Sequence, residues 1–123
     1  MTRRHEEDDL HMTVAQFLDL ALPEDAVWTT IEHGGKRDKR EAGRLKAKGV
    51  KPGWPDIIIL YRGRMVAIEL KSEKGRLSPA QKAMHTRLTL AGALVYTATC
   101  LEAVEGFLSA FMPLRATTGA RAA

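Results

Sequence analysis

Cysteine and long apolar runs are both scarce in this chain of 123 residues. Its single cysteine, Cys100, permits neither an internal disulfide nor a cysteine zinc cluster, which fits a reducing cytoplasm. Any metal must then be held mainly by oxygen. The nearest approach to a membrane span, Ile57 to Tyr61, falls far short of the roughly 18 apolar residues required. Residues 1–9 turn acidic where a signal peptide needs its apolar stretch, so we expect a cytoplasmic protein without membrane contact.

Basic residues are concentrated in one part of the chain. Residues 36–51 contain eight Lys or Arg against only Asp38 and Glu41, which makes this segment +6, whereas the whole chain is +4. A polyanion, most plausibly nucleic acid, is therefore the first partner to consider. The alternative is a solvated helix face. The residues that we expect to contact DNA are Lys36, Arg37, Arg44, Lys46, Lys48 and Lys51.

The spacing of apolar residues predicts a single α/β domain over residues 1–112, followed by a disordered tail at 113–123. Residues 57–61 are apolar on both faces, which is typical of a central strand covered on both sides. The predicted elements are a helix from Glu7 to Pro23, a strand at 27–31, a short basic helix at 38–49, strands at 57–61 and 65–71, a helix at 78–92, a strand at 93–98 and a helix starting with a cap at Thr99.

Asp56, Glu69 and Lys71 form the one constellation with clear chemical meaning. Residues two apart in a strand project from the same face about 6.6 Å apart, and a hairpin turn at residues 62–64 can bring Asp56 alongside Glu69 and Lys71. Two carboxylates can bind Mg²⁺ or Mn²⁺, with the carbonyl of Leu70 as a further candidate ligand, and the ammonium can orient a water. Such a set suits phosphodiester hydrolysis. The alternative is an exposed charged pair on a strand, with Asp56 capping a turn.

The wider pattern resembles a known family. His33-Gly34-Gly35, the run Lys46 to Asp56 that ends in Gly53-Trp54-Pro55-Asp56, Ile68 to Lys71 and Ser78 to Gln81 are similar to the motifs of the virus-type replication-repair nuclease (VRR-NUC) family. That family belongs to the PD-(D/E)xK nuclease superfamily, and the resemblance spans roughly residues 7–105. Family members commonly carry asparagine at the position of His33 and an aliphatic residue at that of Trp54, so the role of position 33 stays open.

The resemblance implies both a fold and a set of site residues. The fold is the restriction-endonuclease-like αβββαβ core, a mixed four-stranded sheet flanked by helices, with an inserted short basic helix. Asp56 and Glu69 would be metal ligands, Lys71 the catalytic lysine, Gln81 a motif residue on the following helix, and Glu7 a carboxylate on the first helix. A capping box alone would also explain Gln81, and Glu6 is a rival to Glu7. The histidines share no metal-ligand spacing, which argues against a histidine zinc site.

We therefore expect a Mg²⁺- or Mn²⁺-dependent DNA endonuclease that is selective for branched DNA, such as four-way junctions or flaps, in replication, recombination or repair. Its setting would be the cytoplasm of a bacterial or phage-infected cell. Standalone members resemble dimeric junction-resolving enzymes, so a homodimer is expected. Two alternatives remain: a catalytically silent nuclease-fold subunit that binds DNA, and a nuclease acting on RNA. The candidate dimer surface includes apolar residues of the first and last helices, Phe17, Leu18, Phe107 and Phe111; the alternative is that these residues cover the protomer's own sheet.

Overall fold

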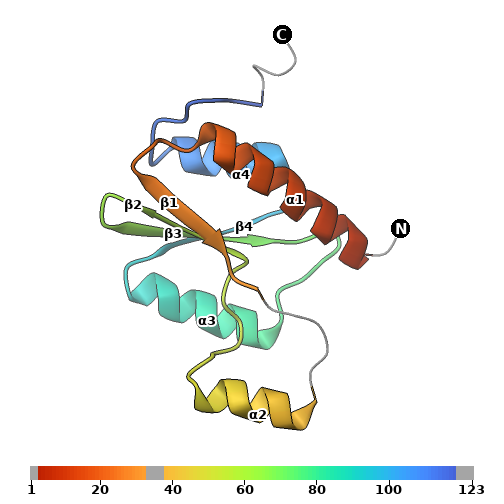
Figure 1. The fold of residues 1–123 in the computed structure, drawn as a ribbon. Helices are drawn as coiled ribbons and strands as arrows, with labels where there is room; N and C mark the ends of the chain where they lie inside the picture. Colours follow the sequence, from red (N-terminus) through yellow and green to blue (C-terminus); the bar gives the residue numbers. More distant parts are fainter. Residues whose placement is uncertain (1–2, 33–37, 119–123) are drawn as a thin grey trace.

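The computed structural model describes residues 3–32 and 38–118 (Figure 1). Each predicted helix and strand is present in the predicted order, with ends that differ by a few residues. Among the described residues no helix is both long and apolar enough to cross a membrane. The elements are α1 (Arg3–Ala21), β1 (Ala26–Thr30), α2 (Lys39–Ala47), β2 (Ile57–Tyr61), β3 (Arg64–Leu70), α3 (Pro79–Leu90), β4 (Leu94–Ala98) and α4 (Leu101–Ser109).

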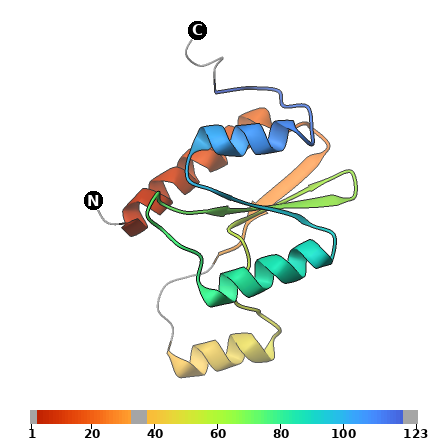
Figure 2. The ribbon, with the colours of Figure 1, turned by 180° about the vertical axis from the view of Figure 1, so that it is seen from behind.

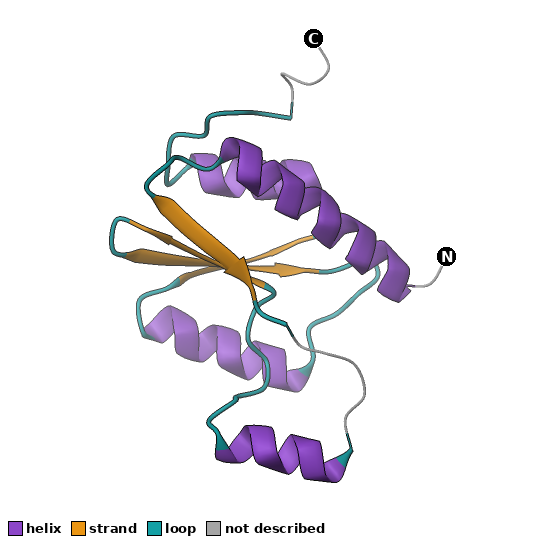
Figure 3. Cartoon of the chain, viewed as in Figure 1, coloured by secondary structure: helices purple, strands orange, loops and turns teal. Residues whose placement is uncertain are grey.

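The strands form one mixed sheet in the order β1-β2-β3-β4 (Figure 3). The first two pairings are antiparallel, and β3 pairs with β4 in parallel across the connection that contains α3. A two-residue turn joins β2 to β3, and its residues Arg62 and Gly63 have φ values of 48° and 80°, as the favoured hairpin turn requires. This is the mixed sheet flanked by helices that the sequence predicts.

Helices cover the two faces of the sheet unequally (Figures 1 and 2). α1 and α4 pack on one face, and α3 lies on the other. The main core fills the α1–α4 side, where Ile57, Ile59 and Ile68 are fully buried. Because side chains alternate along a strand, Glu69 points away from this core, toward α3.

The main core also contains two residues that we had expected at a dimer surface. Phe17 and Leu18 are only 3% and 1% exposed, because α1 uses them to cover the sheet. Their assignment to an intermolecular surface is therefore wrong for this fold. Phe111 remains 41% exposed and packs edge-on against Phe107, which is itself partly buried and stacked on Tyr96.

The apolar sequence of β2 predicts a strand that is covered on both faces. In the structure one face of β2 is only partly covered. α3 packs against β4 and the start of β3, with a small cluster of Met84, Leu88 and Ala93 beneath it. Leu60 on β2 and its register partner Val27 on β1 are consequently 52% and 69% exposed. The sheet therefore shows bare apolar surface beyond the edge of α3.

Two details at the C-terminal end differ from the expectations. The N-cap of α4 is Cys100 rather than Thr99, and its side chain makes no capping hydrogen bond. Residues 113–118, expected to be disordered, lie against the α1–α4 layer: Arg115 donates to the carbonyls of Ala21 and Leu22, and the Thr118 N–H donates to Glu105. The rest of the tail, residues 119–123, lies outside the described residues. Hydrogen bonds of both backbone and side chains, which composition does not reveal, hold the first part in place.

Candidate active site

Asp56 lies where an irregular segment enters β2. Residues 51–55 contain two prolines and a glycine, so they cannot continue α2. Gly53 has a φ of 87°, and a β-carbon built there would lie 2.2 Å from the carbonyl oxygen of Ala80. The segment thus passes directly over the first turn of α3, and only glycine fits at the crossing. The segment places Asp56 at the end of the sheet that lies beside the first turn of α3.

Asp56 is fixed by strands on both sides. Its carbonyl accepts a hydrogen bond from the N–H of Ile31 at 2.7 Å, and its Oδ2 accepts one from the N–H of Leu70 at 2.8 Å. The register pairs Ile57 with Ile68, so the next positions along the two strands are Asp56 and Glu69. Residues directly opposite each other in a sheet share a face. The structure therefore brings together the two carboxyl groups that the sequence singled out.

Glu69 is almost completely buried, with 2% of its surface exposed. Burial is the main cause that raises the pKa of Glu69, to about 9. The hydrogen bond that protonated Glu69 donates to Asp56, and the negative charge of Asp56, add to this shift. The positive charge of Lys71 acts in the opposite direction. In the absence of a cation this pair of carboxyl groups therefore keeps a proton at neutral pH.

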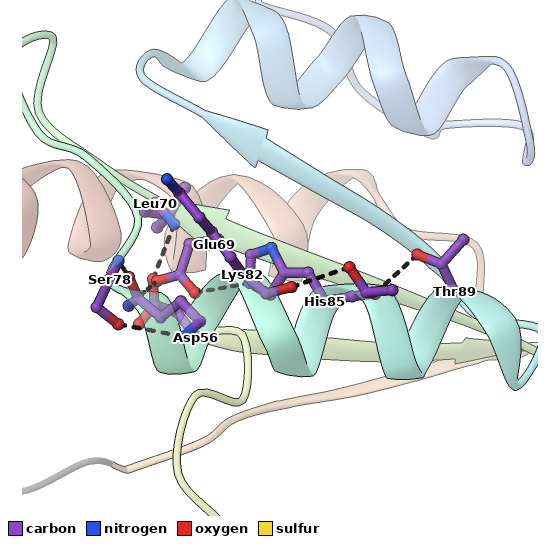
Figure 4. Close-up of polar contacts among 9 residues, drawn as sticks. Asp56, Glu69, Leu70, Ser78, Lys82, His85 and Thr89 are labelled. Carbon is purple, nitrogen blue, oxygen red and sulfur yellow. Dashed lines mark hydrogen bonds and ion pairs between the residues drawn. The ribbon is translucent and has the colours of Figure 1, made fainter.

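Two side chains from α3 contact the Glu69 carboxylate (Figure 4). Gln81 Nε2 donates to Oε2 at 3.3 Å, and His85 Nε2 lies 3.2 Å from Oε1. Gln81 also completes the capping box, because its Oε1 accepts from the N–H of Ser78 at 2.8 Å while its own N–H donates to Ser78 Oγ. The two explanations of Gln81 are therefore both correct, since one end of its amide caps the helix and the other end meets Glu69.

His85 is the site residue that the sequence interpretation missed. It was considered only as a zinc ligand, for which no spacing with the other histidines existed. Its side chain is 12% exposed, and burial lowers its pKa, with the charge of Asp56 opposing that shift and the charge of Lys71 adding to it. The available signal was its distance from Gln81: residues four apart lie on the same face of a helix.

Lys71 and Glu7 approach the same end of β3. Lys71 is partly buried and acts electrostatically on both Glu69 and His85. Glu7 reaches across from α1, where its Oε2 accepts from the N–H of Ser72 at 3.3 Å and its charge adds to the raised pKa of Glu69. Its rival Glu6 is exposed and lines a hollow beside Lys71. Of the two glutamates, it is therefore Glu7 whose charge acts on Glu69.

The donor set fits a hard divalent cation. Asp56 and Glu69 supply carboxylate oxygens, Leu70 lies between Glu69 and Lys71 with its carbonyl as a further oxygen, and Glu7 lies nearby. Within residues 3–32 and 38–118, no three Asp, Glu, His or Cys side chains already form a metal-ligating group. A cation here would thus rely on the Asp56–Glu69 pair, completed by backbone oxygen and water, as Mg²⁺ commonly does.

The predicted DNA-binding residues lie on and around α2, which stands apart beyond α3 and buries none of its residues (Figure 2). Lys36 and Arg37 lie outside the described residues, as does His33. Arg44 is paired with Glu41 at 2.7 Å, which offsets part of the positive charge of the helix. Lys46, Lys48 and Lys51 are exposed, and the first and last of these line a hollow between α2 and residues 50–53.

The fold and the site together define a class. A mixed β1-β2-β3-β4 sheet, with an aspartate entering β2 and Glu-Leu-Lys ending β3, is the restriction-endonuclease-like core of PD-(D/E)xK proteins. The model of the VRR-NUC domain family matches residues 2–100, so this chain belongs to that family of nuclease domains.

Solved structures agree with this assignment. One, described as a VRR_NUC domain protein, aligns over 86% of this chain and 87% of its own, with a TM-score of 0.68 and 23% identity. A second, described as a VRR_NUC domain, covers 86% of this chain and 97% of its own, with a TM-score of 0.56 and 18% identity. At these identities the likeness shows the shared fold. A search among curated protein sequences gave no match.

Proposed function

We propose that this nuclease domain is a Mg²⁺- or Mn²⁺-dependent endonuclease that cleaves branched DNA. The observation that carries the proposal is the Asp56–Glu69 pair, two carboxyl groups on one face of the sheet with the pKa of Glu69 raised to about 9. Such a pair is unfavourable when both groups are ionised, and a bound cation removes the cost. Carboxyl pairs with a strongly shifted pKa are typical of functional sites.

Each residue then has a defined task. Asp56 and Glu69 hold the cation, with the carbonyl of Leu70 as an additional oxygen. The cation would offset the negative charge that develops on the phosphate during in-line attack by water. Lys71, whose charge already acts on this site, orients the attacking water or the phosphate. Gln81 holds Glu69 in place from α3.

The exposed lysines of the α2 region support nucleic acid as the substrate. Lys46 and Lys51 line a hollow together with Pro52 and Gly53, which belong to the segment that leads to Asp56, so phosphates held there would lie beside the route to the carboxyl pair. Cutting a four-way junction takes two cuts related by two-fold symmetry, and this chain carries one Asp56–Glu69 pair. We therefore infer that the working unit is a homodimer.

The proposal is tested by incubating the purified protein with labelled duplex, flap, four-way-junction and single-stranded DNA, and with matched RNA, each with Mg²⁺, Mn²⁺ or EDTA. We expect cleavage only with a metal, and faster cleavage of branched DNA than of duplex. Protein purified identically with Asp56→Asn controls for contaminating nucleases. Tight DNA binding without cleavage in either metal would instead identify a silent DNA-binding subunit, and preferential cleavage of RNA would overturn the choice of substrate.

A further inference from the structure

Glu69 is contacted through both of its oxygens from one direction. His85 Nε2 lies 3.2 Å from Oε1, and Gln81 Nε2 lies 3.3 Å from Oε2. Both partners project from α3, one helical turn apart, so the helix presents two nitrogens to the two oxygens of a single carboxylate. Figure 4 shows the His85 contact. A carboxylate has about four acceptor positions. When Nε2 of His85 carries the ring proton, α3 uses two of them, and the remaining lone pairs are left for the side occupied by Asp56.

The orientation of the Gln81 amide is fixed by its other contact. Its Oε1 accepts from the backbone N–H of Ser78, which can only donate, so its NH₂ must be the end that faces Glu69. From α3, Gln81 alone holds only Oε2 of the carboxylate. His85 supplies the contact on Oε1, so together the two side chains hold both oxygens.

His85 is placed to hold Glu69 rather than to bind a metal itself. Its Nε2 faces the Glu69 carboxylate at 3.2 Å and is engaged by that contact. The ring is 12% exposed, and with Thr89 and Val95 it lines a shallow hollow between α3 and β4. Because so little of the side chain is exposed, the surrounding protein restricts the imidazole, and its contact with Glu69 can be well ordered.

We propose that His85 is a positioning residue that, together with Gln81, locks the Glu69 carboxylate in the orientation that binds the catalytic cation. This inference rests on the proposed function, since it concerns the cation that Asp56 and Glu69 would share. Hydrogen bonds to a ligating carboxylate commonly contribute 10- to 100-fold to metal affinity. Loss of the His85 contact should therefore weaken cation binding while leaving both carboxylate ligands in the chain.

The test is a titration of the metal-free protein with Mn²⁺, in which electron paramagnetic resonance measures the unbound ion. Wild-type protein should show a site that Glu69→Gln abolishes. His85→Leu, which cannot donate, and His85→Asn, which is too short to reach, should each weaken Mn²⁺ binding roughly tenfold or more. His85→Gln places an amide near the position of Nε2 and should restore affinity to within about threefold.

Thr86→Ala is the matched control, because Thr86 is an exposed neighbour on α3 whose hydroxyl only bonds the carbonyl of Lys82. It should bind Mn²⁺ as wild type does. In cleavage assays His85→Asn should raise the metal concentration needed for half-maximal rate more than it lowers the rate at saturating metal. Wild-type affinity in both His85→Leu and His85→Asn, or equal losses in His85→Asn and His85→Gln, overturns the positioning role. Absence of any Mn²⁺ site in wild-type protein overturns the proposed function itself.

Discussion

At the scale of single residues, the main electrostatic cost in the site is that of ionising Glu69. Burial and the neighbouring Asp56 raise its pKa from 4.5 to about 9, so the folded chain binds a proton that the unfolded chain releases. The stabilisation from this proton is complete below about pH 4.5 and is lost as the pH rises toward 9. A group of this kind changes the free energy of unfolding by at most about 1.4 kcal/mol per pH unit.

This behaviour gives a prediction for Glu69→Gln in the presence of a chelator. The neutral amide can accept from Gln81 through its oxygen and donate to a neutral His85, so the packing is kept while the charge is removed. Denaturant unfolding between pH 5 and 9 should show wild-type protein losing stability with rising pH more steeply than the variant. The variant should be the more stable of the two at pH 8. Equal slopes for the two proteins would show that Glu69 does not titrate in this way.

The site residues differ in how much of their role sequence alone reveals. Asp56, Glu69 and Lys71 were predictable because strand spacing and a short hairpin determine which of them meet. Gln81 was ambiguous because a capping box and an active-site contact both place glutamine at that position, and the structure shows both contacts. His85 was missed because its partner lies on another element, and only the packing of α3 on β3 brings the two together.

At the scale of elements, the loop into β2 and the first turn of α3 are built against each other. Gly53 touches the backbone of Ala80, the residue before Gln81, so the loop that carries Asp56 and the helix that holds Glu69 share one contact. Gly49 has a similarly positive φ of 97° but nothing within 4 Å of the position of a β-carbon. Substitutions at the two glycines can therefore be compared to separate the cost of a positive φ from the cost of a steric clash.

We predict different costs for alanine at these two glycines. Gly49→Ala should cost only the left-handed backbone strain, about 1 kcal/mol. Gly53→Ala adds a clash with rigid backbone, for which roughly a further 1–3 kcal/mol is expected, and it should also reduce cleavage by shifting Gln81. Thermal or denaturant unfolding measures both variants. Equal stability losses would mean that the loop and α3 are not in tight contact.

The α2 region gives a second prediction at this scale, concerning salt dependence. Replacing Lys46 and Lys51 by glutamine should weaken DNA binding across sequences and reduce the slope of log affinity against log salt by about 2. Arg62→Gln with Arg64→Gln removes the same charge from the β2–β3 hairpin and serves as the control. Fluorescence anisotropy at several salt concentrations measures both slopes. An equal reduction in the two double variants would show that net charge alone, rather than the α2 region, determines binding.

Periodicity and turn residues predicted the helices and strands closely. They did not predict which parts of the sheet the helices cover. The sequence of β2 predicts burial on both faces, and α3 is too far toward β4 to cover Leu60. The start of the predicted disordered tail is held by hydrogen bonds of Arg115 to carbonyls at the end of α1. Both differences arise from the relative placement of elements, about which local sequence patterns carry little information.

At the scale of the whole molecule, we predict a dimer. A chain of 13.6 kDa with one carboxyl pair needs a second copy to make two symmetric cuts, so light scattering at micromolar concentration should give about twice that mass. The measurement is made alone and with a four-way junction. A monomer under both conditions that still nicks flaps would contradict junction resolution and leave a flap or general endonuclease.

We propose that the Asp56–Glu69 pair is the metal-dependent catalytic centre of this nuclease domain. Its most direct test is single-turnover cleavage of a labelled four-way junction by wild-type protein and Asp56→Asn, with DNA affinity measured in parallel. The substitution removes one charge beside Glu69 and leaves the side chain nearly unchanged in size. We predict that Asp56→Asn loses at least 100-fold in cleavage rate, on the order expected for removal of a key transition-state interaction, with DNA affinity within a few-fold of wild type. Cleavage by Asp56→Asn at the wild-type rate would contradict the account.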